Sequence, residues 1–239
     1  MDIRTFAIVA VLSLAATGCG ASAPTPSSGP ASATDGPKVQ RVVWASELPA
    51  AIANNPRMLC CNDHHQLRPI YENLIGIDAA TGKQVPQLAT SWSLEQEGRA
   101  VRFKLREGVR FNSGDWGNFS AKDVAYTWQV LVDNEDSSNR RTYWKATVKS
   151  VDVVNDHEVL FNLVPDAQFF NGVSELYGQL LMHSKAYQDA KGEPKGIEVP
   201  APPGTGPYEY ESRDQASYIR FKRVGYQHWR TMPDFPELE

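Results

Sequence analysis

The chain has 239 residues, with 24 Lys and Arg against 28 Asp and Glu, so its formal net charge is -4 at pH 7. The two signs are interspersed without a basic run, which excludes the electrostatic footprint of a nucleic-acid-binding protein. The length suffices for one large domain or two small ones. No apolar segment after Thr17 is long enough to cross a bilayer as a helix.

The first residues indicate an export signal. An apolar run from Phe6 to Thr17 follows Arg4, and about a dozen residues are too few to span a hydrocarbon layer of about 30 Å. The sequence ATGC at 16–19 resembles a bacterial lipobox, in which the cysteine thiol accepts a lipid. We expect residues 1–18 to be a signal peptide and Cys19 to be lipidated, with an ordinary secretory signal as the alternative.

The next stretch predicts a tether. Residues 20–37 contain no large apolar side chain and consist mostly of Ala, Ser, Pro, Thr and Gly. Because such a stretch cannot bury a core, we predict that residues 19–37 are a lipidated cysteine followed by a disordered linker. The expected product is an exported lipoprotein, periplasmic or in the cell envelope, anchored to a bacterial membrane.

Residues 39–83 predict a strand, a helix and a turn. The strand covers 39–45, where β-branched and aromatic residues dominate. A helix over 66–77, with Pro69 in its first turn, is predicted by four apolar residues at helical spacing: Leu67, Ile70, Tyr71 and Leu74. The turn covers 79–83.

Residues 86–131 begin a second unit. Period-two alternation predicts half-buried strands at 101–105 and 109–111. Ser120 is the expected N-cap of a helix, with Asp123 as an acceptor in its first turn. The buried stripe of this helix is expected to be Val124, Thr127, Trp128 and Leu131.

The last part of the chain alternates strands with one helical region. Strands are predicted at 147–154 and 158–163, joined by a turn at Asn155-Asp156. Helical material is expected over 169–190, followed by paired strands at 208–211 and 217–224. The pattern is a mixed α/β architecture with antiparallel pairs.

Five fragments of the sequence resemble one known family. They occur in the order IYENL (70–74), PQLATSW (86–92), FKLREGVRFNSG (103–114), FSAKDV (119–124) and GTGPY (204–208). Together they resemble the family 5 extracellular solute-binding proteins, the peptide, dipeptide and nickel receptors of ABC importers. Residues 226–229 (YQHW) look like the Asn-Pro-x-Tyr-Trp segment of that family.

The resemblance implies a fold and a domain organisation. The fold is the mixed-sheet α/β, periplasmic-binding-protein-like (type II) fold, in which two lobes close over a solute. Family members are longer, so residues 38–239 are expected to be the N-terminal part of the solute-binding domain. This part would hold the first lobe and an extra subdomain at about 54–165, with the second lobe missing.

The resemblance also implies a function. We expect a lipid-anchored substrate-binding component of an ABC importer for peptides, with a small solute and a membrane permease as partners and no cofactor. A nickel or other metal receptor, and an exported lipoprotein that acts as an interaction module without transport, are the alternatives. The chain has no Gly-x-Ser-x-Gly elbow, no His-Glu-x-x-His helix and no Gly-rich phosphate loop, so we do not expect an enzyme.

Two regions are candidates for the solute site. In receptors of the family, the segment before the IYENL-like motif contributes to the cleft, which here implicates Cys60, Cys61 and Asn62. The loop after the Trp128 helix contributes an aromatic residue, for which Tyr143 is the nearest candidate.

The segment at 60–65 (CCNDHH) also has the composition of a metal site. In a helix, Cys60 with His64 and Cys61 with His65 fall at i,i+4 on one face, a spacing that can chelate zinc, copper or nickel. A vicinal disulfide between Cys60 and Cys61 and a plain loop are the other interpretations.

Overall fold

The computed structural model describes residues 39–45, 54–56, 63–133, 138–165, 180–192, 200–214 and 217–239. All of them belong to one compact unit, Lys38–Glu239. Within these ranges no helix combines the length and the apolar character needed to cross a membrane.

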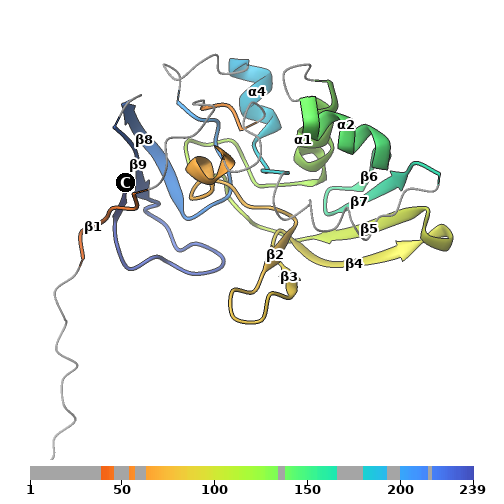
Figure 1. Ribbon diagram of the computed structural model, residues 1–239, viewed down its shortest axis with the longest axis horizontal. Coiled ribbons are helices and arrows are strands. Elements are labelled where there is room, and N and C mark those ends of the chain that lie inside the picture. The colour runs from red at the N-terminus through yellow and green to blue at the C-terminus, as the bar shows by residue number, and fades with distance from the viewer. Residues whose placement is uncertain are drawn as a thin grey trace, which may run out of the picture. The chain divides into compact units, whose positions relative to one another are not determined.

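The strands in these ranges form three sheets (Figure 1). Their bounds are β1 (Arg41–Val42), β2 (Ile75–Ile77), β3 (Gln84–Pro86), β4 (Ala89–Glu95), β5 (Ala100–Leu105), β6 (Val148–Asn155), β7 (Glu158–Leu163), β8 (Tyr208–Asp214), β9 (Tyr218–Arg223) and β10 (Glu237–Leu238). The sheet orders are β1-β10-β9-β8, β2-β3 and β4-β5-β7-β6. Of the pairs among these strands, β1 with β10 is parallel and the others are antiparallel, which confirms the predicted mixed architecture.

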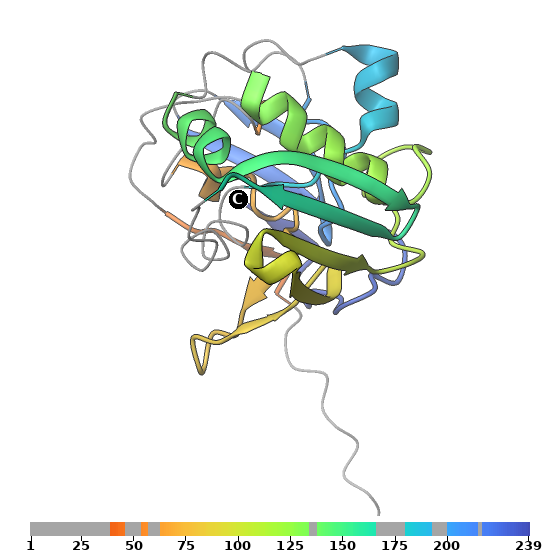
Figure 2. The same cartoon turned by 90° about the vertical axis from the view of Figure 1, so that its right-hand side faces the viewer.

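Two helices, α1 (Ala121–Asp133) and α2 (Ser138–Thr147), cover one face of the β4-β5-β7-β6 sheet (Figure 2). The predicted start of α1 is confirmed, because the backbone N–H and the hydroxyl of Ser120 both donate to Oδ2 of Asp123, over 2.8 and 2.9 Å. The predicted stripe of this helix is buried. The other helices are α4 (Lys185–Lys191) and the 3-10 helices η1 (Asp63–Leu67) and η2 (Gln96–Gly98).

The main core lies between this sheet and its helices. Phe103 of β5 and Phe161 of β7 meet edge to face, with ring centroids 5.1 Å apart. Trp128 of α1 and Trp144 of α2 pack in the same buried cluster. The period-two burial of β5 and β7 confirms the strands predicted at 101–105 and 158–163, because alternate side chains point into this core.

The β1-β10-β9-β8 sheet covers a second, smaller core. Tyr208 of β8 and Phe221 of β9 are buried there with Leu67, Ile70 and Tyr71. Both strands predicted at 208–211 and 217–224 are present. The edge strand β1 is held to β10 by backbone bonds and by an ion pair of 2.5 Å between Arg41 and Glu237.

The prediction of a helix over 66–77 is wrong. The chain instead forms η1, an irregular stretch and β2, although the four apolar residues that suggested a helix are all buried. The backbone carbonyls of 69–74 accept hydrogen bonds from other segments, with donors from Gln87, Leu88, Ala89, Met182, Gly206 and Tyr208. Tertiary hydrogen bonds therefore replace the i to i+4 bonds of a helix, and Pro69 has no N–H to contribute to one.

Three smaller predictions also differ from the structure. Residues 109–111 alternate in burial as expected, but Arg110 forms only an isolated bridge with Asn118. The turn between β6 and β7 lies at residues 156–157, one residue later than predicted. Of the helical region expected at 169–190, residues 180–184 are not helical, 185–190 lie in α4 (Lys185–Lys191), and 169–179 lie outside the described residues.

Candidate functional site

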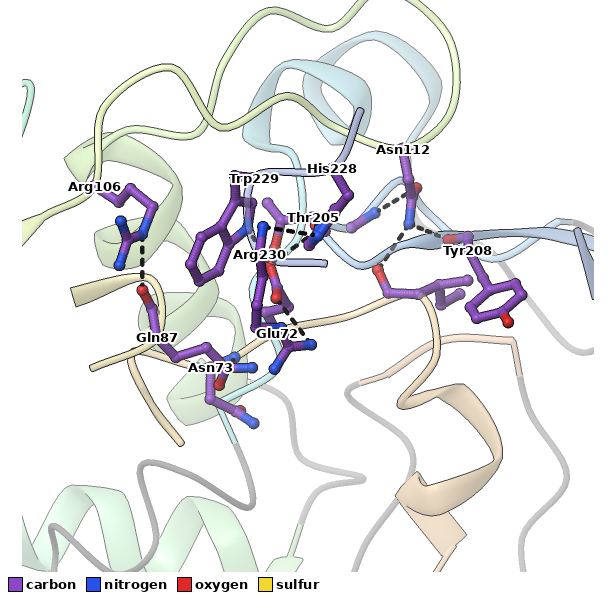
Figure 3. Close-up of polar contacts among 12 residues, drawn as sticks. Glu72, Asn73, Gln87, Arg106, Asn112, Thr205, Tyr208, His228, Trp229 and Arg230 are labelled. Atoms are coloured by element: carbon purple, nitrogen blue, oxygen red, sulfur yellow. Dashed lines mark hydrogen bonds and ion pairs between the residues drawn. The ribbon is translucent and has the colours of Figure 1, made fainter. Parts of the chain in front are cut away.

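Segments that lie far apart in the sequence meet around Glu72 (Figure 3). They come from the stretch before β2, the segment after β5, the loop before β8 and the stretch before β10. Three of the five fragments that resemble the solute-binding family, together with the YQHW segment, thus contribute to one junction. The polar residues drawn there include Glu72, Asn112, Thr205, His228 and Trp229.

The buried amide of Asn112 joins three of these segments. Its Nδ2 group donates to the carbonyl oxygens of Ile70 and Tyr208, over 2.8 and 2.6 Å. Its Oδ1 atom accepts the backbone N–H of Gly204 over 3.1 Å. Both donors and the acceptor of this side chain are therefore used, as a buried amide requires.

Two glycines let the loop before β8 approach this junction. An ideal Cβ on Gly204 would lie 2.0 Å from the carbonyl oxygen of Ile70, and one on Gly206 would lie 2.4 Å from that of Pro69. Distances below 3.0 Å cannot be accommodated against backbone atoms. The two glycines of the GTGPY fragment are thus required by a close backbone contact rather than by a positive φ.

The carboxylate of Glu72 lies at the centre of the junction and is 1% exposed. Its Oε2 atom accepts the indole N–H of Trp229 over 2.9 Å, and its Oε1 atom lies 3.3 Å from Nη2 of Arg230. Burial raises the pKa of this carboxyl, while Arg230 and the Trp229 N–H act in the opposite direction.

His228 is a neutral imidazole in this arrangement. Its Nε2 atom lies 2.9 Å from the carbonyl oxygen of Thr205, which can only accept, so Nε2 carries the proton. Its Nδ1 atom accepts the backbone N–H of Arg230 over 3.2 Å. Burial lowers the pKa of His228, in agreement with this single protonation.

Arg106 adds a second guanidinium to the junction. Its centre lies 4.1 Å from the centroid of the Trp229 ring, and its Nε atom donates to the carbonyl oxygen of Gln87 over 3.2 Å. Arg230 pairs with the Glu72 carboxylate, whereas Arg106 lies against the ring of Trp229. Arg230 has half of its side chain exposed, whereas Glu72 is enclosed.

This arrangement holds segments together and cannot perform acid–base catalysis on a solute. Glu72 and His228 each have 1% of the side chain exposed, so no solute can reach their titrating atoms without disrupting the junction. The accessible chemistry consists of the partly exposed Arg230 and the indole of Trp229, which suit binding rather than bond breaking.

The candidate residues derived from the sequence lie elsewhere or outside the described residues. Cys19, Cys60, Cys61 and Asn62 are outside them, and for His64 only the backbone, in η1, is described. His65 is exposed in η1. Tyr143 lies in helix α2 rather than in a loop, where it packs against the main core and meets Trp144 edge to face at 5.7 Å. The solute-contact and metal assignments therefore stay predictions.

Apart from Arg230, the junction residues lie in the segments on which the resemblance rests, but sequence analysis assigned them no role. A carboxylate inside an otherwise apolar stretch, as in IYENL, was the available signal, because a buried acid needs a partner. Nothing in the sequence identified that partner.

The chain is similar to known proteins in sequence and in structure. The model of the bacterial extracellular solute-binding proteins, family 5 Middle, matches residues 83–239. The "Probable ABC transporter periplasmic-binding protein SapA" of Escherichia coli K12 is 30% identical over 183 residues, which cover 70% of this chain and 33% of that protein. The dipeptide-binding protein of the same organism is 27% identical over 189 residues, 71% of this chain and 34% of its own length. The chain thus spans about a third of the length of these relatives.

Solved structures show the same fold. The periplasmic binding protein DppA from Helicobacter pylori, in complex with the peptide STSA, superposes with a TM-score of 0.69 at 23% identity, covering 83% of this chain and 41% of that chain. The dipeptide-binding protein of a Pseudoalteromonas species, in complex with Met-Leu, gives 0.68 at 23% identity, covering 83% and 42%. This confirms the predicted periplasmic-binding-protein-like fold, and with the family match it shows that the chain belongs to the bacterial extracellular solute-binding proteins of family 5.

Proposed function

We propose that the chain is the substrate-binding component of an ABC importer for peptides, exported and anchored to a bacterial membrane through lipid on Cys19. The observation that carries this proposal is the family match over residues 83–239. The names of curated relatives support the substrate class, since they include a peptide transport periplasmic protein of Salmonella typhimurium and a di/tripeptide-binding protein of Pseudomonas aeruginosa. The proposed partners are a short peptide and a membrane permease.

The geometry supports binding by a rigid surface. The buried ring of His228 bonds to the Thr205 carbonyl and accepts the backbone N–H of Arg230, so the side chains of Trp229 and Arg230 project from a constrained backbone. Fixed side chains lose less conformational entropy when a solute binds. In a two-lobed receptor, the solute binds more tightly to the closed form and shifts the equilibrium toward closure.

Peptide binding is tested directly with the purified chain. We choose saturation-transfer NMR, which detects weak complexes, because the chain spans about a third of its relatives. The probes are Ala-Ala, Met-Leu and tri-alanine, with free alanine and glucose as controls. We expect saturation transfer to the peptides and none to the controls. Equal signals for peptides and controls, or no signal for any peptide at millimolar concentration, would overturn the peptide assignment.

Lipid anchoring is tested by fractionation of bacterial cells that express the full chain. We expect Cys19→Ala to move the protein from the membrane pellet to the soluble fraction, because Cys19 is the residue that the lipobox-like motif designates. Cys60→Ala is the matched control and should stay in the pellet. A Cys19→Ala variant that still sediments after a high-salt wash contradicts the anchoring proposal.

A further inference from the structure

His228 holds in place the stretch that carries the solvent-accessible side chains of the junction. Its side chain is 1% exposed, and both ring nitrogens form hydrogen bonds. Nε2 donates to the carbonyl oxygen of Thr205 over 2.9 Å, and Nδ1 accepts the backbone N–H of Arg230 over 3.2 Å. The backbone N–H of His228 lies 3.2 Å from the Sδ atom of Met232. One buried ring thus connects residues 228–230 to the loop before β8.

The neutral ring leaves one position for a second proton. Because Nε2 already carries the proton that it donates to Thr205, an added proton binds at Nδ1. The lone pair of Nδ1 is the acceptor of the Arg230 N–H, and two N–H groups cannot form a hydrogen bond with each other. Protonation of His228 and the bond to the Arg230 backbone therefore exclude one another.

The nearest charges and the burial of the ring set the pH range in which this happens. Burial lowers the pKa of His228 from its usual 6.5, and Arg230 acts in the same direction. Oε2 of Glu72 lies 3.8 Å from Nε2 of His228 and would attract an imidazolium, but the same carboxylate also pairs with Arg230 at 3.3 Å. The ring therefore stays neutral near pH 7 and takes up its second proton under acidic conditions.

Two other titratable side chains belong to these surroundings. Arg106 lies 4.1 Å from the centroid of the Trp229 ring, which is itself 5.6 Å from the ring of His228. The guanidinium of Arg106 keeps its charge in acid. Burial raises the pKa of Tyr226, so this phenol stays neutral there. The charge changes of the junction in the acidic range thus come from Glu72 and His228.

The bond that protonation removes lies next to the surface proposed to bind peptide. Trp229 stands between His228 and Arg230 in the chain, and its indole N–H and the Arg230 guanidinium both contact Glu72. When the Arg230 N–H loses the ring as its acceptor, it needs another one, which favours movement of residues 229–230 toward water. The accessible side chains are then no longer held in one orientation.

We propose that His228 is the positioning residue of the solute-binding surface: its neutral ring holds Trp229 and Arg230 in the orientation that binds peptide, and a proton on Nδ1 releases them, so that peptide binding weakens as pH falls. The effect on peptide rests on the proposed function. The release of residues 229–230 rests on the contacts of the ring, and it is measured without any peptide.

The first experiment follows the backbone amides of the ¹⁵N-labelled full chain by hydrogen exchange. We expect the protection factor of the Arg230 amide to fall at least about tenfold between pH 7.0 and pH 5.0, because its acceptor is lost. The amide of Asn112, which donates to the carbonyl oxygen of Gly204 in the same junction, is the internal control. It should keep its protection, which separates a local release from general unfolding in acid.

The variant His228→Asn separates titration from structure. Asparagine places an amide oxygen where Nδ1 lies, so it keeps an acceptor for the Arg230 N–H and takes up no proton in this range. His183→Asn is the matched control, since His183 is also buried and its Nδ1 atom lies 3.0 Å from the carbonyl oxygen of Leu181. The pH response of the Arg230 amide should be absent from His228→Asn and unchanged in His183→Asn.

The second experiment measures the affinity for Ala-Ala by NMR titration at the same two pH values, at which both peptide termini are charged. Wild type and His183→Asn should bind at least about fivefold more weakly at pH 5.0, because fewer molecules hold the binding orientation. The affinity of His228→Asn should change by less than about twofold. Glu72 is present in all three proteins, so its own titration does not produce this difference.

The two experiments fail independently. If the protection of the Arg230 amide is the same at both pH values, or falls equally in His228→Asn, the inference is overturned whatever the peptide does. A peptide affinity that falls equally in wild type and His228→Asn overturns it as well. If the amide responds as expected but Ala-Ala binds at neither pH, the proposed function fails, and the release of residues 229–230 by protonation of His228 stands.

Discussion

Trp229 donates its indole N–H to the buried carboxylate of Glu72 over 2.9 Å, across 157 residues of chain. The contact ties the stretch before β10 to the stretch before β2, and Arg230 holds the second oxygen of the same carboxylate. One acidic side chain thus fixes the relative position of two segments that carry the family motifs.

The strength of this contact can be measured with a double-mutant cycle. Trp229→Phe removes the donor, and Glu72→Met removes the acceptor at similar size. We expect a coupling energy of about 1.5–3 kcal/mol, because the hydrogen bond has a charged acceptor and is buried. Urea unfolding of the wild type, both single variants and the double variant gives the value. If the effects of the two substitutions on the free energy of unfolding are additive, the contact contributes nothing to stability.

The raised pKa of Glu72 predicts how the free energy of unfolding depends on pH. In the unfolded chain this carboxyl titrates near 4.5, and in the folded protein at a higher pH because of burial. Between these two pKa values the folded state binds more protons, so the stability from this group is present below pH 4.5 and is lost as pH rises through the folded pKa.

Urea unfolding of wild type and Glu72→Gln between pH 4 and 8 tests this dependence. We expect the free energy of unfolding of wild type to fall relative to that of the variant as pH rises. The same comparison in a His228→Gln background removes the contribution of His228, whose lowered pKa gives stability that is lost as pH falls below 6.5 and whose Nε2 atom lies 3.8 Å from Glu72. Parallel curves would mean that Glu72 titrates normally.

The buried amide of Asn112 should be a large local contributor to stability. Asn112→Ala leaves the carbonyl of Tyr208 and the N–H of Gly204 without this partner, and we expect a loss of about 2–4 kcal/mol in the free energy of unfolding. The control is Asn118→Ala, an exposed position on the same segment, which should change stability by less than about 0.5 kcal/mol. Chemical denaturation measures both, and equal small losses would contradict the role given to Asn112.

The close approach of the GTGPY loop makes a methyl group there intolerable. Gly204→Ala places a Cβ 2.0 Å from the Ile70 carbonyl oxygen, so we expect a loss of about 3 kcal/mol or more, or no soluble folded protein. Gly225→Ala is the control, since its Cβ would meet nothing within 4 Å. Circular dichroism during heating compares the two, and a Gly204→Ala variant as stable as Gly225→Ala would refute the contact.

The elements that sequence analysis located were those set by local patterns. The start of α1 followed from Ser120 and Asp123, and the β6-β7 hairpin followed from two alternating runs around a turn. These signals act within a few residues and are readable without knowing the fold.

The predictions that failed concern segments whose conformation is set by long-range contacts. The apolar spacing between Leu67 and Leu74 is compatible with a helix, but the Asn112 side chain, 42 residues from Ile70, takes part in holding that stretch in an irregular conformation. The junction around Glu72 was unpredictable for the same reason, since Trp229 and Arg230 are remote in sequence.

The pairing of β1 with β10 constrains the order of events during synthesis. Among the described strands, β1 has β10 as its single neighbour, and Arg41 and Glu237 lie 196 residues apart. During synthesis, almost two hundred residues are therefore added after β1 before its partner strand β10 emerges from the ribosome. Until then Val43 and Trp44, which are 64% and 65% exposed even in the folded state, adjoin an unpaired strand edge. Among the strand pairs of the described residues, β1 and β10 are thus the farthest apart in sequence, so the edge of β1 stays unpaired longest while the chain is being made.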